Sequence, residues 1–439
     1  MNVDTPQASI NTIPVEILTE IFGYFLPKGN ALDPPIPPLV TFVSVCRHWR
    51  QASLNAPYLW STIRLYNPRP SRIQMLRQWL ERSKACPLTL MLEIYPRSSG
   101  DRAEWTQLVG VMEEVLSILI RQTHRWKHLD LQLIDFPIHP KSPLLRLPTS
   151  PGAAPLLEQV CISESASFTV EAVETMWRVI GGYSGVRHVL WHTGLERTKS
   201  CLTQFAAWSS ITHLSSHFVF DDHFLHFLSQ SHMLEDLCVS LLESTDSALP
   251  LIPNQRLCLP NLRKLNIPSS SPTALAHFLD HLELPTLYSL RVVQWHSGDA
   301  WIRMLQHSSC QLKTLELCDR SLSDGGITQL LASPALAQLE ELSIQLWCPA
   351  SQLLWFLTLN PDATALHLPY LRKMIMSFGG FTMGLLSTML KSRLYGTVVP
   401  RALTHINLSL GLARAYGDIS ADMSFLKHLH ETGFDITYE

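Results

Sequence analysis

One recurring stretch decides the fold. Leu262–Val292 reads LRKLNIPSSSPTALAHFLDHLELPTLYSLRV, in which an alternating apolar run is followed by a turn, a helix-like stretch at Thr273–His281 and a second alternating run. Alternation of apolar and polar residues over four to eight positions predicts a half-buried strand, whereas apolar residues three and four apart predict a helix. The stretch therefore predicts strand, helix and strand in succession.

The LxxLxL pattern of the two alternating runs recurs along most of the chain. Neighbouring copies lie between 23 residues apart (Leu214 to Leu237) and 32 residues apart (Met374 to Ile406). One strand and one helix bury their apolar faces only against neighbouring copies, so we expect a stacked α/β solenoid with parallel strands inside and helices outside. The middle residues of the copies are Leu129, Val160, Val189, Leu214, Leu237, Leu265, Leu290, Leu315, Leu342, Met374 and Ile406.

This repeat resembles an irregular leucine-rich repeat. No copy has Asn or Cys three residues after the pattern, where that family builds its side-chain ladder. We therefore expect a less regular curve than in a strict repeat protein.

The N-terminal sixty residues follow a different pattern. Residues 13–26, IPVEILTEIFGYFL, predict an amphipathic helix of about three turns. The proline-dense segment Pro27–Pro38 cannot continue that helix. Helical periodicity returns at Leu39–Ser53, and a short turn at Pro57–Trp60 leads into Thr62–Leu65.

Taken in order, these residues resemble the F-box, although the proline-rich insertion is longer than the usual link between its first two helices. The following segment, Trp79–Ile94, resembles the continuation found in a group of fungal F-box-like proteins. The resemblance implies docking to a Skp-type adaptor, which joins the protein to a cullin-RING ubiquitin ligase. The residues that carry the F-box resemblance are Ile13, Pro14, Glu16, Ile17, Leu18, Ile21, Phe22, Val45, Cys46, Arg47, Trp49, Arg50, Pro57, Leu59 and Trp60.

Elementary packing gives a related expectation. Three short helices cannot bury all their apolar side chains among themselves, so one face should seek a partner surface. The alternative is a helical cap that packs on the rest of the chain. The expected adaptor contacts are Ile13, Pro14, Ile17, Leu18, Ile21, Phe22, Val43, Trp49, Leu59 and Trp60.

We predict the following organisation: disordered residues 1–9, a three-helix F-box at 10–65, an αβ connector at 66–124 and the solenoid at 125–439. Residues 134–155 contain six prolines and are expected to form a surface loop that folding does not require. Alternation along the strands should place one set of polar side chains on a shared concave surface, where a protein target would bind. These residues are Asp236, Lys264, Asn266, Arg291, Glu316, Glu341, Gln345, Lys373 and Asn407.

Composition excludes several classes of function. The 439 residues carry a formal net charge of −3, which gives no global field to attract nucleic acid or an acidic membrane. The N-terminus lacks the basic and apolar regions of a secretory signal, and three charge-poor windows are too polar or too interrupted to span a bilayer. We therefore expect a cytoplasmic or nuclear protein.

Two patterns that suggest chemistry have simpler interpretations. The nine cysteines form no CxxC pair, so we expect reduced thiols and no zinc module. The histidine-rich run His213–His226 suggests a metal site, but residues four apart on a strand lie about 13 Å apart, too far to bind one ion. We therefore expect no catalytic residue, metal or cofactor.

The sequence as a whole predicts a substrate-recognition subunit of an SCF-type (Skp–cullin–F-box) ubiquitin ligase in the ubiquitin-conjugation pathway. The F-box would bind the adaptor and the repeats would bind a protein target, without enzymatic activity of their own. The alternative hypothesis is a repeat scaffold that binds partners without degrading them.

Overall fold

The computed structural model describes residues 13–26, 38–96, 102–150, 152–164, 169–192, 210–242, 256–293, 298–318, 322–360, 367–396, 403–410 and 419–438. The chain divides into two compact units, Met1–Ser210 and Ile211–Glu439, and each is described by itself. The disorder expected at residues 1–9 and the proline-rich linker at 27–37 lie outside the described residues.

The first unit begins with short helices. Helix α2 ends at Val45, and Cys46 adopts an extended conformation before α3 begins. The Cys46 thiol accepts a hydrogen bond from the Trp49 amide at 3.4 Å, which caps α3 and explains why the single helix expected at Leu39–Ser53 is two helices. The elements are α1 (Val15–Tyr24), α2 (Pro38–Val45), α3 (Arg47–Asn55) and the 3₁₀ helix η2 (Pro57–Trp60).

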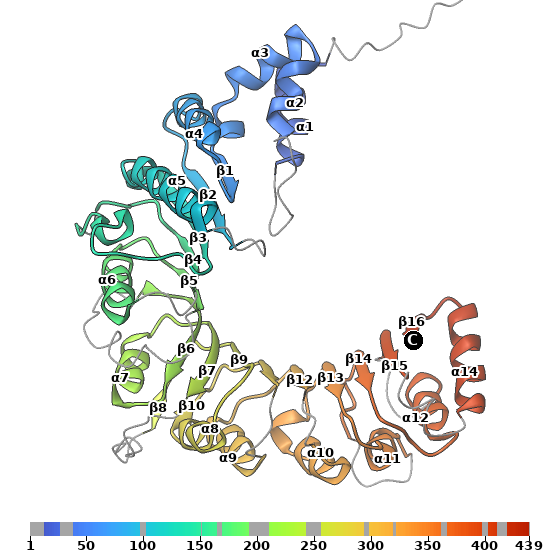
Figure 1. The fold of residues 1–439 in the computed structure, drawn as a ribbon. Coiled ribbons are helices and arrows are strands. Elements are labelled where there is room, and N and C mark those ends of the chain that lie inside the picture. The colour runs from blue at the N-terminus through green and yellow to red at the C-terminus, as the bar shows by residue number, and fades with distance from the viewer. Residues whose placement is uncertain are drawn as a thin grey trace, which may run out of the picture. The chain divides into compact units, whose positions relative to one another are not determined.

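Five parallel strands with intervening helices complete this unit (Figure 1). The sheet begins earlier than the repeat pattern predicts, because Ile63 pairs with Leu90 and Leu90 with Leu129. The connector expected at 66–124 therefore contributes to the same sheet. The elements of the first unit after η2 include β1 (Thr62–Tyr66), α4 (Pro70–Arg82), β2 (Leu88–Ile94), α5 (Arg102–Ile120), β3 (Trp126–Leu133), β4 (Gln159–Glu164), α6 (Val170–Gly181) and β5 (His188–His192).

The second unit repeats strand and helix in a parallel sheet of nine strands (Figure 1). The strands are β6 (His213–Val219), β7 (Asp236–Leu242), β9 (Lys264–Ile267), β11 (Ser289–Val292), β12 (Thr314–Cys318), β13 (Glu341–Gln345), β14 (Lys373–Ser377), β15 (His405–Ser409) and β16 (Asp435–Tyr438). The helices are α7 (Asp222–Gln230), α8 (Pro272–Asp280), α9 (Gly298–Ser308), α10 (Asp324–Leu331), α11 (Ser351–Leu357), α12 (Leu385–Leu394) and α14 (Ser420–Glu431).

Register in this unit follows the repeat pattern. The middle residues of neighbouring copies pair directly, as in Leu265 with Leu290 and Leu315 with Leu342, and all are buried. Each copy buries its leucines against the next, which is why one copy cannot fold alone. The expected α/β fold, a small helical region followed by a solenoid-like repeat region, is confirmed.

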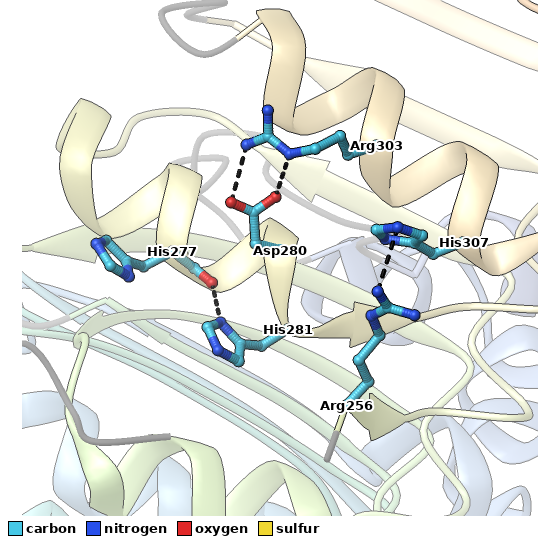
Figure 2. Close-up of polar contacts among 6 residues, drawn as sticks. All are labelled: Arg256, His277, Asp280, His281, Arg303 and His307. Carbon is cyan, nitrogen blue, oxygen red and sulfur yellow. Dashed lines mark hydrogen bonds and ion pairs between the residues drawn. The ribbon is translucent and has the colours of Figure 1, made fainter. Parts of the chain in front are cut away.

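Polar contacts also join neighbouring helices of the second unit (Figure 2). The Arg303 guanidinium on α9 binds both carboxylate oxygens of Asp280 on α8 at 2.8 Å. A two-residue strand, β8 (Leu257–Cys258), pairs with β10 (Leu282–Glu283), and Arg256 just before it donates to His307 Nε2 at 3.2 Å. Because these side chains are exposed, their contacts orient the neighbouring helices more than they contribute to the free energy of folding.

Asp422 links two helices through buried hydrogen bonds. Its fully buried carboxylate on α14 accepts the Gly384 amide at 2.7 Å and the Ser387 amide at 2.8 Å at the start of α12. We expect Asp422→Ala to lower the free energy of unfolding by about 3 kcal/mol, since two buried donors lose a charged acceptor. Urea denaturation measures this change. The exposed Lys427→Ala variant of the same helix should match the wild type, and equal stability of both variants would contradict this role.

The described residues of the proline-rich segment 134–155 are packed, which differs from the expected surface loop. The 3₁₀ helix η4 (Pro143–Arg146) contacts α5 and α6, and the Tyr183 hydroxyl donates to the Pro148 carbonyl at 2.7 Å. Proline density rules out a long helix but does not prevent burial. The buried side chains of the segment are those of Phe136, Ile138, Leu144, Leu147 and Ala154.

Across the described ranges, no helix combines the length and apolar character that a bilayer crossing requires.

Candidate functional site

The N-terminal helices enclose a small aromatic core. Phe22 on α1 stacks on Phe42 of α2 with ring centroids 4.4 Å apart, and Trp49 of α3 lies 4.9 Å from Phe22. Leu18 and Phe22 are fully buried in this core. The expectation that these two residues contact a partner is therefore wrong, because they hold the three helices together.

Trp60 ends the helical region and fixes it to the following helix. Its indole Nε1 donates to the Ser53 carbonyl at 2.8 Å, and its ring meets Trp79 of α4 edge-on at 5.9 Å. The Arg82 guanidinium lies 4.5 Å from the Trp60 ring centroid. Trp60 and its neighbour Leu59 are buried. Both residues are thus internal anchors rather than the partner contacts that we expected.

The exposed face of α1 carries large apolar side chains. Ile17, Ile21 and Tyr24 are 49%, 39% and 71% exposed. At about 100° per residue, the three lie within about 60° of one another around the helix axis. Single exposed apolar residues are common, but three neighbours on one helix stripe mark an interaction surface. We call Ile17, Ile21 and Tyr24 the apolar stripe.

Of the remaining expected contacts, Pro14 is exposed, whereas Ile13, Val43 and Trp49 are half-buried. The sequence reasoning missed Tyr24 of the stripe. Six further large apolar side chains in this region are exposed and were not among the expected adaptor contacts, namely Val15, Phe25, Val40, Val45, Leu54 and Tyr58. A helical projection centred on Phe22 would have placed Tyr24 beside Ile17 and Ile21, since the three recur at helical spacing.

The comparisons with known proteins agree with this geometry. Residues 10–66 match the model of the F-box-like family. No curated protein matches the chain significantly. The chain therefore carries an F-box-like domain over the helices that display the apolar stripe. F-box domains generally bind Skp-type adaptors, so this domain is a protein-interaction module.

The residues expected to bind a target fall into neighbouring rows on the second sheet. Asp236, Lys264, Glu341 and Lys373 lie in the first row, which also contains Ser289 and Thr314. Asn266, Arg291, Glu316 and Asn407 lie in the second row, and Gln345 lies in a third. Alternation places all three rows on one face, which we call the polar strand face.

Most charges on the polar strand face are paired with one another. Arg291 Nε lies 3.2 Å from Glu316 Oε1, and Lys373 Nζ lies 4.0 Å from Glu341 Oε2. His405 and Asp435 form a further close contact at 2.7 Å. The face is thus polar with little net charge, and exposed pairs of this kind contribute at most about 1 kcal/mol each.

Histidines gather in two places without forming a metal site. His213 and His217 lie on β6, while His223 and His226 lie on α7. His281 Nδ1 contacts the His277 carbonyl at 2.6 Å, beside the Arg256–His307 contact (Figure 2). Among the described residues, no group of three or more His, Cys, Asp or Glu side chains could hold a metal ion.

Proposed function

We propose that this chain is the substrate-recognition subunit of an SCF-type ubiquitin ligase. The apolar stripe on an F-box-like domain carries this proposal, because Ile17, Ile21 and Tyr24 lie where a Skp-type adaptor would cover them. The adaptor would attach the chain to a cullin-RING ligase. The chain would act in the cytoplasm or nucleus and catalyse no reaction. Its contribution would be to raise the concentration of a bound target near the ubiquitin-loaded enzyme.

We further assign the repeats to an irregular leucine-rich-repeat class and the chain to the fungal F-box-like group. The in-register parallel strands, each followed by a helix, support the repeat assignment. Within this proposal the repeats bind a protein target through the polar strand face. A face with paired charges of both signs suits a polar protein segment better than a nucleic acid or a lipid.

The target-binding proposal predicts the effect of charge reversal. Replacing Lys264, Arg291 and Lys373 together with Glu should lower target capture by about tenfold, since a polar interface loses complementary contacts. Replacing Arg291 and Lys373 also removes the ion-pair partners of Glu316 and Glu341. The matched control is therefore Glu316→Gln with Glu341→Gln, which breaks the same two ion pairs without adding negative charge. Quantitative pull-down of a target identified by proximity labelling measures both. Full capture by a folded triple variant would locate binding elsewhere.

One reconstitution separates the receptor from a scaffold without degradation. The purified chain is combined with a Skp-type adaptor, a cullin-RING complex and the ubiquitin-loaded enzyme, and ubiquitin transfer to the identified target is followed. A receptor forms the complex and supports transfer. A scaffold binds the adaptor and target, but the target gains no ubiquitin and its turnover in cells is unchanged by proteasome inhibition. Failure to bind any Skp-type adaptor would overturn the receptor proposal and leave a scaffold that binds other partners.

A further inference from the structure

The first sheet carries a polar cluster that the receptor proposal does not use. Its side chains alternate with the buried aliphatic residues of β1–β4. Strand register places Tyr66 beside Glu93 and Glu93 beside Gln132. The adjacent row places Asp130 beside Cys161. Four strands thus bring two carboxylates, a thiol, an amide and a phenol together.

The cluster holds more negative than positive charge. The Arg64 guanidinium binds Glu93 Oε1 through Nη2 at 2.8 Å and through Nε at 3.1 Å. Both side chains are nearly buried, so this pair is strong and specific. Asp130 is the second carboxylate, and Arg64 is already held by Glu93. Among the cluster residues that the structure describes, one cation lies beside two acids.

Asp130 is incompletely satisfied where it lies. Its Oδ1 atom is buried and has no hydrogen-bond partner among the described residues. Burial raises the pKa of Asp130, and the nearby Glu93 carboxylate raises it further, while hydrogen bonds from Cys161 and Gln132 and the charge of Arg64 act in the opposite direction. A buried carboxylate oxygen without a partner is costly, and a cation held near this half-buried side chain would offset part of that cost without contacting Oδ1.

Two tyrosines lie at the edge of the cluster. The rings of Tyr66 and Tyr95 are 5.8 Å apart, and Tyr66 is largely exposed. Tyr95 is held in place, because its amide donates to Asn67 Oδ1 at 2.8 Å and its hydroxyl donates to Gln132 Oε1. Asn67 accepts a left-handed backbone (φ 39°), which Asn tolerates better than most residues. Aromatic faces beside carboxylates attract cations.

We propose that this cluster binds a cationic side chain, lysine or arginine, presented by a protein partner. The Asp130 carboxylate would receive the charge, Glu93 would add to the negative field, and Tyr66 would flank the aliphatic stem. The negative excess disfavours nucleic acid, whose phosphates it would repel. The proposal rests on this geometry alone and stands whether or not the chain serves a ubiquitin ligase.

Matched synthetic peptides on the purified full-length chain test the proposal. Three fluorescent peptides share one neutral Gly/Ser/Ala sequence and carry three Lys, three Arg or three Gln residues at the same positions. We expect the Lys and Arg peptides to bind at least about tenfold more tightly than the Gln peptide in fluorescence polarisation. That preference should weaken as salt rises from about 50 mM to about 500 mM.

Two variants locate the binding. Asp130→Asn should abolish the preference for Lys and Arg while leaving the melting temperature equal or higher, because it removes an uncompensated buried charge. Tyr66→Ala should lower affinity for the Lys peptide about threefold, and its exposed position keeps this variant folded should Asp130→Asn fail to fold. Glu431→Gln, an acid-to-amide change at an exposed position on α14, is the control and should behave as the wild type.

The outcomes decide the proposal as follows. Equal binding of the Gln and Lys peptides by the wild type would overturn it. An Asp130→Asn protein that folds and keeps the full preference would also overturn it, as would loss of the preference in Glu431→Gln. Unchanged affinity of Tyr66→Ala for the Lys peptide would show that Tyr66 does not contact the bound side chain. If Asp130→Asn also fails to fold, the same result would overturn the proposed site.

Discussion

Aspartate at both Ile17 and Ile21 should lower affinity for a Skp-type adaptor more than about 100-fold while the protein stays folded. Both side chains are exposed in the free chain, so the change costs little within the F-box-like domain. In the complex they would be covered, and burying two unpaired carboxylates in an apolar interface costs more than about 3 kcal/mol. Titration of the purified adaptor by calorimetry measures the loss, and circular dichroism reports the fold.

Two controls make this expectation specific. Trp355→Asp changes an even more exposed apolar residue on α11 of the second unit and should leave adaptor affinity unchanged. Phe22→Ala removes the centre of the aromatic core and should lower the melting temperature of the first unit, so any loss of binding there reflects unfolding. Wild-type affinity in the folded Ile17/Ile21 double variant would show that the apolar stripe does not dock the adaptor.

Replacing residues 134–155 with a Gly/Ser linker of the same length should destabilise the first unit by more than about 4 kcal/mol. The change removes the buried side chains of Phe136, Leu144 and Leu147, and Leu144 belongs to η4, which contacts α5 and α6. Deleting one buried aromatic or leucine commonly costs about 2 to 5 kcal/mol, and equal length keeps the loop-closure entropy similar. Denaturant unfolding followed by fluorescence should show the first unit melting earlier.

Single substitutions separate packing from chain length in that segment. Phe136→Ala alone should produce a large part of the loss, about 3 kcal/mol. Leu156→Ala, just beyond the segment and exposed, should produce almost none. A linker variant as stable as the wild type would restore the interpretation of this segment as a dispensable loop.

The sequence predicted the repeat sheet well because its information is local. Each LxxLxL copy specifies which side chains of its own strand point inward, and neighbouring copies then have one register that buries all of them. The two earliest strands escaped notice although Trp60, Ile63 and Leu65 have the repeat spacing. These residues were assigned to the end of the F-box, yet they also open the first sheet.

The candidate site was predicted less well because burial depends on distant residues. Leu18 and Ile21 both look apolar along α1, and periodicity alone does not say which faces inward. Phe42 and Trp49 lie more than twenty residues after Ile21 in the sequence. Their packing on Phe22 decides which face of α1 points inward. The loop at 134–155 was misjudged for a similar reason, since its proline content describes the backbone and says nothing of what its apolar side chains cover.

The position of Trp60 limits movement between the F-box-like domain and β1. Only Ser61 separates the buried Trp60 from β1. The F-box-like domain and the strand that follows it are therefore connected without a flexible linker. An adaptor that docks on the F-box-like domain would therefore also orient the strands β1–β5 that follow it in the first unit.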